Sequence, residues 1–406
     1  MFDPGSFFFQ NRIVPIASQI FIFGSNILGG SATEARHVLS KGLDFCKKNT
    51  VTVVAFFAAL VTVFFVPLSR AYLDYFDWKT LACLFSVLAV VNALRNLKFF
   101  YQLAHFAVRH FSTMRRAALA LVTVTFLGSM LIANDMALLT FLPLGYLVLK
   151  ETGREDKMAP LFILQNIAAN LGGMLTPFGN PQNLYLYGKF QIPTGAFLAA
   201  MAPSFAFSVC LIALSCVFCF GPEKLSIPKE KVVLPKGKTV LYLFLFALSI
   251  VMVFRVLPYY IGLAIIFFAL LILDRSALKK VDYPLLFTFF FFFIFAGNLA
   301  RIAPVRTFLS GLLQKDPLVV SALSCQVISN VPSAILLSQF TSSWKGLLIG
   351  VNIGGTGTLI ASLASLITFR EYTRHNPGKA GKYLALFSAF NFSFLILLIL
   401  FNLILR

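Results

Sequence analysis

The chain has 406 residues, of which 59% are hydrophobic and 12% are charged, and its net charge is +19. Soluble domains are about half apolar and about a quarter charged, so this composition excludes an ordinary soluble domain and predicts a polytopic membrane protein. The basic excess accompanies no nucleic-acid-binding motif and no separate basic helix. We interpret it by the positive-inside rule and expect a lipid bilayer, not a nucleic acid, as partner.

Apolar runs recur along the chain, and a helix needs about 20 apolar residues to cross a bilayer. A weaker candidate at 11–30 lies in an N-terminal segment, 1–50. The stronger candidates cover residues 51–67, 80–95, 159–190, 195–220, 239–256, 259–273, 283–299, 346–369 and 383–404.

Two further apolar stretches, 117–149 and 317–340, carry a polar tip in the middle: "ANDM" at 133–136 and "SNVPS" at 329–333. We predict that each is a re-entrant hairpin, which enters and leaves the membrane on one side. With this topology, 24 of the 34 Lys and Arg fall on six loops of one face. The positive-inside rule makes that face cytoplasmic and places the C-terminus outside.

The two halves of the chain repeat each other. "NLGGMLT" at 170–176 aligns with "NIGGTGT" at 352–358, and Ala133-Asn134 aligns with Ser329-Asn330. We predict an all-α protein of two inverted repeats, 51–220 and 239–406, joined by a basic cytoplasmic linker at 221–238. Each repeat has about five transmembrane helices plus one hairpin, and the helices that break at the midplane are typical of secondary transporters.

The Gly- and Pro-rich breaks have a physical reason. In hydrocarbon every backbone N–H and C=O needs a partner, so unwound backbone survives only where it lines protein or a polar cavity. A broken helix presents carbonyl oxygens, which suit Na⁺, at one end. At the other end it presents N–H groups and a positive dipole, which suit an anion. An alternative interpretation is a kink with Gly at a helix–helix contact.

Asp135 is the only acidic residue between Asp77 and Glu151, and it lies in the first tip. A carboxylate inside a membrane is costly and is therefore a functional candidate. It would balance a bound cation or carry a proton; the alternative is a helix N-cap. No Lys or Arg falls in either tip or break, so the charge of an anion would be met by helix dipoles, neutral groups and a co-bound cation.

The segments "IANDMALLTFLPLGYLVLK" and "QNIAANLGGMLTPFGNPQNLYLY" resemble the ion transporter superfamily. Its members include citrate transporter-like proteins, divalent anion–sodium symporters, arsenite permeases and NhaD-type antiporters. The closest resemblance is to small bacterial anion permeases. It implies a homodimer in a bacterial-type inner membrane, an elevator mechanism, and two cation sites that flank the substrate.

The polar residues of the tips and breaks, together with the resemblance, indicate the site residues. The cation-binding set, for Na⁺, is Asn134, Asp135, Gly172, Gly173, Gly179, Ser329, Asn330, Asn352, Gly354 and Gly355. The substrate-binding set is Asn134, Thr176, Asn180, Asn183, Asn330, Ser333, Thr356 and Thr358. The symporters carry Ser-Asn-Thr at both tips, whereas this chain has Ala-Asn-Asp and Ser-Asn-Val. The first tip is more similar to the arsenite permeases and antiporters.

We therefore predict a secondary active transporter of a small anion, a carboxylate or inorganic oxyanion, coupled to Na⁺ or H⁺. One alternative is a Na⁺/H⁺ antiporter that uses Asp135; another is an arsenite or oxyanion efflux permease. An enzyme is not expected, because the sequence has no His, Asp or Glu cluster at a membrane boundary. No cofactor is expected other than the coupling ion.

Overall fold

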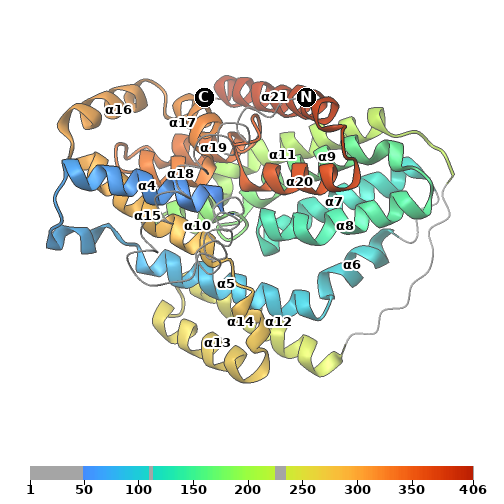
Figure 1. The fold of residues 1–406 in the computed structure, drawn as a ribbon, viewed down its shortest axis with the longest axis horizontal. Coiled ribbons are helices and arrows are strands. Elements are labelled where there is room, and N and C mark those ends of the chain that lie inside the picture. Colours follow the sequence, from blue (N-terminus) through green and yellow to red (C-terminus); the bar gives the residue numbers. More distant parts are fainter. Residues whose placement is uncertain (1–48, 109–112, 225–234, 406) are drawn as a thin grey trace, which may run out of the picture. The chain divides into compact units, whose positions relative to one another are not determined.

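A computed structural model describes residues 49–108, 113–224 and 235–405 (Figure 1). Two compact units divide the chain, 1–58 and 59–406, and the architecture given below is that of the second unit. The expected helix at 11–30 and most of the linker at 221–238 lie outside the described residues.

The described residues form helices joined by short turns and breaks, and they contain no strand. Within them, seven helical segments are long and apolar enough to cross a membrane: Trp78–Asn96, Met114–Ile132, Glu155–Leu175, Thr194–Cys219, Lys236–Val253, Tyr283–Arg301 and Ala380–Ile404. The predicted all-α polytopic membrane protein is confirmed.

From residue 78 in the first half and from residue 283 in the second, the described helices follow one another in a similar pattern, whereas the elements before these residues differ. The first half contains α4 (Thr50–Phe65), η2 (Arg70–Tyr75), α5 (Trp78–Asn96), α6 (Phe99–Val108), α7 (Met114–Ile132), α8 (Asn134–Glu151), η3 (Glu155–Lys157), α9 (Met158–Gly172), η4 (Gly173–Leu175), α10 (Pro181–Lys189) and α11 (Thr194–Cys219). The second half contains α12 (Lys236–Val253), α13 (Tyr259–Leu273), α14 (Arg275–Lys279), α15 (Tyr283–Arg301), α16 (Ala303–Lys315), α17 (Pro317–Ile328), α18 (Asn330–Leu337), α19 (Trp344–Ile353), α20 (Leu363–His375) and α21 (Ala380–Ile404).

Side-chain caps set where several of these helices begin. Asp77 accepts a hydrogen bond from Thr80 N at 3.0 Å at the start of α5, and Asp282 accepts one from Leu285 N at 3.0 Å at the start of α15. Such caps satisfy N–H groups that the first helical turn leaves unpaired. Asp77 and Asp282 are therefore caps of the same kind in the two halves.

Both polar tips are sharp breaks between two helices. One residue separates α7 from α8 and one separates α17 from α18: Ala133, with φ of 66°, and Ser329, with φ of 76°. Non-glycine residues rarely adopt a positive φ, and with ψ near 150° the conformation is almost confined to glycine, so both tips are strained. The first hairpin has arms of 19 and 18 residues. Because α7 alone is long enough to cross a bilayer, the re-entrant topology stays a prediction.

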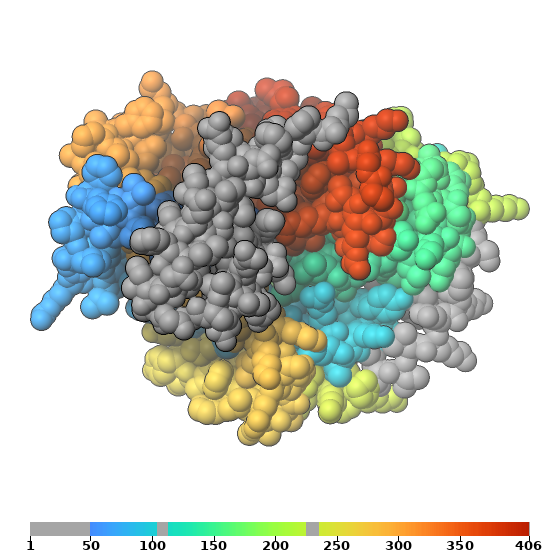
Figure 2. All heavy atoms as spheres, in the orientation of Figure 1, coloured from blue at the N-terminus to red at the C-terminus, as the bar shows by residue number. Residues whose placement is uncertain are grey.

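Two of the predicted spans are interrupted where the sequence placed breaks. Residues 159–190 are divided between α9 and α10, and residues 346–369 between α19 and α20. After each break the helix crosses to the other half, since α10 packs on α18 and α19, while α20 packs on α8 and α9 (Figure 1). The space-filling view shows the orange-red atoms of α20 beside the green atoms of α8 (Figure 2).

Equivalent hydrogen bonds hold hairpin to break in both halves. Thr176 Oγ1 donates to Met130 O at 2.7 Å, and Thr358 Oγ1 donates to Gln326 O at 3.0 Å. The two threonines end the aligned segments, and the two acceptors each lie four positions before the tip asparagine. The halves thus share a local architecture, whereas their inverted orientation stays a prediction.

Candidate transport site

The first tip and the first break meet at Asn170. Asn134 Nδ2 donates to Asn170 Oδ1 at 3.1 Å, and Asn180 Nδ2 donates to Asn170 O at 3.2 Å. All three side chains are buried. The predicted juxtaposition of Asn134 with the break is therefore present, and Asn170 is the residue that joins them.

In the part of the chain that the structure describes, four side-chain oxygens around this junction are buried without a hydrogen-bond partner. Buried polar atoms in native proteins are nearly always paired, and an unpaired one costs about 1–3 kcal/mol. Such atoms therefore indicate a place for a ligand or an ordered water. They are Asn134 Oδ1, Asp135 Oδ1, Asn180 Oδ1 and Gln182 Oε1.

Glycines let the backbone approach closely at the first break. A Cβ on Gly172 would lie 2.2 Å from Phe126 O, and one on Gly173 would lie 2.3 Å from Asn180 Oδ1. A Cβ on Gly179 would lie 2.4 Å from Gly173 O. These three residues of the predicted cation set are required for packing because any side chain would clash.

Asn183 braces the loop of the first break. Its Nδ2 donates to the carbonyl oxygens of Gly173, Met174 and Thr176 at 3.1, 3.2 and 3.2 Å. Its Oδ1 accepts from Asn352 Nδ2 at 2.6 Å. The whole amide of Asn183 is thereby engaged in holding the loop and in joining it to the second half.

Asn352 connects the two breaks. Its Oδ1 accepts from Asn180 Nδ2 at 3.2 Å and from Gln182 Nε2 at 3.4 Å. Its Nδ2 donates to Leu348 O at 2.8 Å as well as to Asn183. Asn352 was predicted as a cation ligand; in the structure both ends of its amide bind protein groups. It links α19 to the segment that opens α10.

At the second tip the side-chain oxygens of Ser329, Asn330 and Ser333 have partners within the protein. Asn330 N donates to Ala361 O at 2.9 Å, and Asn330 Oδ1 accepts from Val331 N at 2.8 Å. Ser329 Oγ donates to Ala361 O at 3.3 Å. Ser333 Oγ lies 2.9 Å from Ser324 Oγ, which belongs to α17, the first arm of the second hairpin.

The second break is held by a residue that the sequence analysis missed, Gln326. Its Nε2 donates to Ala322 O, Gly354 O and Thr356 O at 2.9, 2.9 and 3.1 Å. Its Oε1 accepts from Thr358 N at 2.9 Å. The sequence does contain a signal for this residue: Gln326 is the one amide in the largely apolar run "VVSALSCQVIS".

The remaining predicted residues also lie at these junctions. Thr356 Oγ1 donates to Ile353 O at 2.6 Å, so its hydroxyl hydrogen is used locally. Gly355 lies between the halves: a Cβ there would be 3.2 Å from Asn330 Nδ2 and 3.4 Å from Asn170 Oδ1. The second tip is thereby close to the first break.

One basic side chain approaches the first tip through space. Arg95 of α5 places Nη2 at 3.5 Å from Leu139 O and Nη1 at 3.9 Å from Met136 Sδ. The tips and breaks themselves contain no Lys or Arg, but this guanidinium lies within about one helical turn of Asp135. The sequence offered no signal for it, because Arg95 is 40 positions away from the tip.

Helix N-termini add positive potential. α8 and α18 begin at the tips, and α10 and α20 begin directly after the breaks. The N-terminus of a helix carries about half a positive charge, and it offers free N–H groups to an anion. Together with the unpaired oxygens, the centre thus provides groups suited to an anion and groups suited to a cation.

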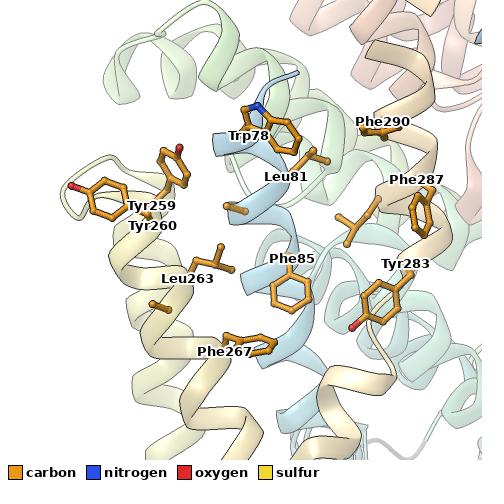
Figure 3. Close-up of a pocket in the computed structure, with 13 residues that line it drawn as sticks. Trp78, Leu81, Phe85, Tyr259, Tyr260, Leu263, Phe267, Tyr283, Phe287 and Phe290 are labelled. Carbon is orange, nitrogen blue, oxygen red and sulfur yellow. The ribbon is translucent and has the colours of Figure 1, made fainter. Parts of the chain in front are cut away.

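A separate hollow of about 690 Å³ lies between α5, α13 and α15 (Figure 3). Its walls are almost entirely aromatic and aliphatic, and Trp78, Phe85, Tyr260, Phe267 and Phe287 are among them. It contains none of the tip or break residues, and its apolar walls offer little to bind an ion. The hollow is therefore not part of the candidate transport site.

A helical membrane protein with paired helix breaks around a buried polar centre has the architecture of a secondary transporter. A family model described as citrate transporter matches residues 45–343, which is well over half of the chain. The chain therefore belongs to the citrate transporter family and is a multi-pass membrane transporter. This confirms the resemblance seen in the sequence.

Similar proteins carry related names. The chain is 35% identical over 295 residues to an uncharacterized transporter of Methanocaldococcus jannaschii, covering 72% of this chain and 81% of the relative. It is 32% identical over 326 residues to the inner membrane protein YbiR of Escherichia coli, covering 78% and 87%. A 46 kDa membrane protein of Mycobacterium leprae is 26% identical over 355 residues, covering 73% and 82%.

Proposed function

We propose that this protein is a secondary active transporter that carries a small anion, a carboxylate or inorganic oxyanion, together with a coupling cation. The observation that carries the proposal is the group of unpaired buried oxygens of Asn134, Asp135 and Asn180 where the first tip meets the first break. Oxygen atoms without donors are what a desolvated Na⁺ requires, and a protonated carboxylate would meet the same need with H⁺. The family description, citrate transporter, supports an organic anion as substrate.

The anion would bind between the tips. Its charge would be balanced by the bound cation, by the N-termini of α8 and α18, and by the N–H and O–H groups of the two tips and breaks. The side chains proposed for this role are Asn134, Asn330 and Ser333, and Asn180 is proposed for the cation through its unpaired Oδ1. The amide of Asn183 and the hydroxyls of Thr176, Thr356 and Thr358 instead hold the breaks. Binding of cation and anion together is electrostatically favourable, because each lowers the cost of holding the other in a low-dielectric site.

Transport would follow an elevator motion in a homodimer within a bacterial-type inner membrane, with the linker 221–238 in the cytoplasm and the C-terminus outside. Single cysteines at 116, which is exposed, and at 152, in a cysteine-free background, should then label from the cytoplasm. Cysteines at 316 and 342 should label from the other side. Labelling of 116 and 152 from opposite faces would contradict this topology.

The ligands are tested by melting the purified protein in detergent with Na⁺ or Li⁺ and, separately, citrate, succinate, sulfate or arsenite. A ligand that binds only the folded protein raises its apparent stability by mass action. We expect a carboxylate to stabilise more in the presence of Na⁺ than in its absence. Stabilisation by arsenite alone would instead favour the efflux permease.

A Na⁺/H⁺ antiporter centred on Asp135 is the second candidate, favoured by the unpaired Asp135 Oδ1. Asp135→Asn in proteoliposomes separates the two functions. In an antiporter the change should abolish Na⁺-driven proton flux. In a symporter it should weaken cation affinity but leave a pH-insensitive substrate flux. Asn preserves the shape of the side chain, and α8 begins at Ala133 without a side-chain cap that the change could remove, so the fold is retained.

A further inference from the structure

We propose that the side-chain amide of Gln326 occupies the second cation site permanently, so that this transporter binds one coupling cation, at the first tip and break. The resemblance implies a second cation held by Ser329, Asn330, Asn352, Gly354 and Gly355. The inference rests on the proposed cation coupling only for the count of ions. The assignment of Gln326 stands on contacts within the second half.

The donors of Gln326 meet the oxygens that a cation would need. Nε2 lies 2.9 Å from Gly354 O and 3.1 Å from Thr356 O, which are carbonyls of the unwound second break. Its third acceptor, Ala322 O at 2.9 Å, belongs to the hairpin arm. An NH₂ group that donates to carbonyls converging from hairpin and break takes the place of a cation between them.

The other end of the same amide fixes its orientation. Gln326 Oε1 accepts from Thr358 N at 2.9 Å, so a flipped amide would lose this bond and set oxygen against carbonyl oxygen. Gly357 has φ of 116°, and a Cβ there would lie 2.1 Å from Gln326 Oε1. The loop is therefore shaped around the inserted side chain.

The other residues of the second set are also engaged. Asn330 Oδ1 accepts from Val331 N at 2.8 Å, and Asn352 Oδ1 accepts from Asn180 and Gln182. In the described part of the chain, no buried side-chain oxygen of the second tip or break lacks a partner. A cation at this position would have to displace the Gln326 amide from four hydrogen bonds.

The first half differs at the equivalent position. Met130 occupies the position that corresponds to Gln326. The backbone carbonyl of each accepts a hydrogen bond from the hydroxyl of the equivalent threonine, Thr176 or Thr358. A thioether has no N–H to donate. Carbonyls of the first break also accept from an amide, that of Asn183, but this residue belongs to α10 and not to the hairpin arm. Among the described residues, Asn134 Oδ1 and Asn180 Oδ1 of the first tip and break still lack a partner. The halves therefore differ in the side-chain oxygens that are left for a cation and in the hairpin-arm amide of Gln326.

The test is thermal melting of full-length variants, purified with NaCl and then exchanged into choline chloride or graded NaCl. Gln326→Glu replaces the donors with a carboxylate among carbonyls. It should melt several degrees below wild type without Na⁺ and regain most of that loss as Na⁺ is added. Gln326→Met, the side chain of the equivalent first-half position, removes donors without adding charge. It should melt lower without this large Na⁺ recovery.

The wild type itself is also informative. Its Na⁺ dependence should have a Hill coefficient near one, and Asn134→Ala should abolish it. A coefficient near two that Asn330→Ala lowers to one would overturn the inference, as would a Gln326→Glu protein that recovers no more than Gln326→Met. If Na⁺ coupling itself is wrong, the wild type will not respond to Na⁺, yet Gln326→Glu will still gain a Na⁺ response.

Discussion

The first and second helix breaks have similar sequences but different hydrogen bonding. In the first, the carbonyls of the loop are braced by Asn183, and the oxygens of Asn134 and Asn180 face no donor. In the second, Gln326 of the hairpin arm binds the loop from both ends of its amide. Similar backbone architecture thus leaves unpaired side-chain oxygens at the first tip and break, whereas the buried ones of the described second tip and break have partners. The difference comes from individual side chains.

The largest effect is expected where the two breaks are joined. Asn352→Ala would leave the buried amides of Asn180, Gln182 and Asn183 without their shared partner. Each newly unpaired group costs about 1–3 kcal/mol, so we expect a loss of about 3 kcal/mol and no transport. Asn402→Ala is a matched control. This buried Asn also bonds to its own helix, at Leu398 O, and among the described residues its distant partner is Ser204 alone. A loss no larger than that of Asn402→Ala would show that the breaks are not coupled.

The two breaks can be compared for how closely their backbones pack, by adding one methyl group to a glycine in each. Gly172→Ala places a Cβ 2.2 Å from Phe126 O, whereas Gly354→Ala places one 2.7 Å from Gly350 O. Overpacking of this kind costs about 1–3 kcal/mol, and we expect the larger fall in melting temperature for Gly172→Ala. Gly311→Ala in α16, where the space is open, serves as the control. It should be neutral or slightly stabilising; equal melting of all three variants would refute the comparison.

The two tip asparagines should differ in their effect on cation binding. Asn134→Ala removes an oxygen that has no donor among the described residues, so it should abolish the response of the melting temperature to the coupling cation. It also removes the donor to the buried Asn170 Oδ1, which costs about 1–3 kcal/mol of stability. Asn330→Ala removes the oxygen that caps Val331 N, and loss of such a cap costs about 1 kcal/mol. The cation response of Asn330→Ala should persist. The reverse pattern would place the cation at the second tip.

The smallest effect concerns the strained residues between the hairpin arms. Ala133 and Ser329 have φ of 66° and 76°, where Gly is the least strained residue. Ala133→Gly should raise the stability by about 1 kcal/mol, since relief of strain outweighs the added freedom of the unfolded chain. Ser329→Gly should gain less, because it also loses the hydrogen bond from Ser329 Oγ to Ala361 O. Calorimetric melting measures both, and a loss in Ala133→Gly would show that the tip is not strained.

Local sequence features predicted much of the architecture. Hydropathy marked the spanning helices, and Gly-Gly followed by Pro marked the break at 172–181, because unwinding inside a membrane needs residues that favour it. The tips at Asn134 and Asn330 were recognised for the same reason, as polar residues within apolar runs. The contribution of Gln326 was not recognised, although it is also a polar residue in an apolar arm. A single Gln within a helix carries no information about which carbonyls it meets.

By itself, the sequence determined the class of protein, the positions of most helices, and the residues at the tips and breaks. These depend on local composition and on the backbone preferences of Gly, Pro and Asn. Tertiary structure alone decided the pairing of Asn352 with Asn183, the approach of Arg95 to the first tip, and the placement of Gln326 in the second break. The physical reason is that membrane helices are apolar on most faces, so periodicity does not identify their neighbours. The crossing of α10 and α20 into the opposite halves determines which amides meet, and therefore which oxygens remain open to an ion.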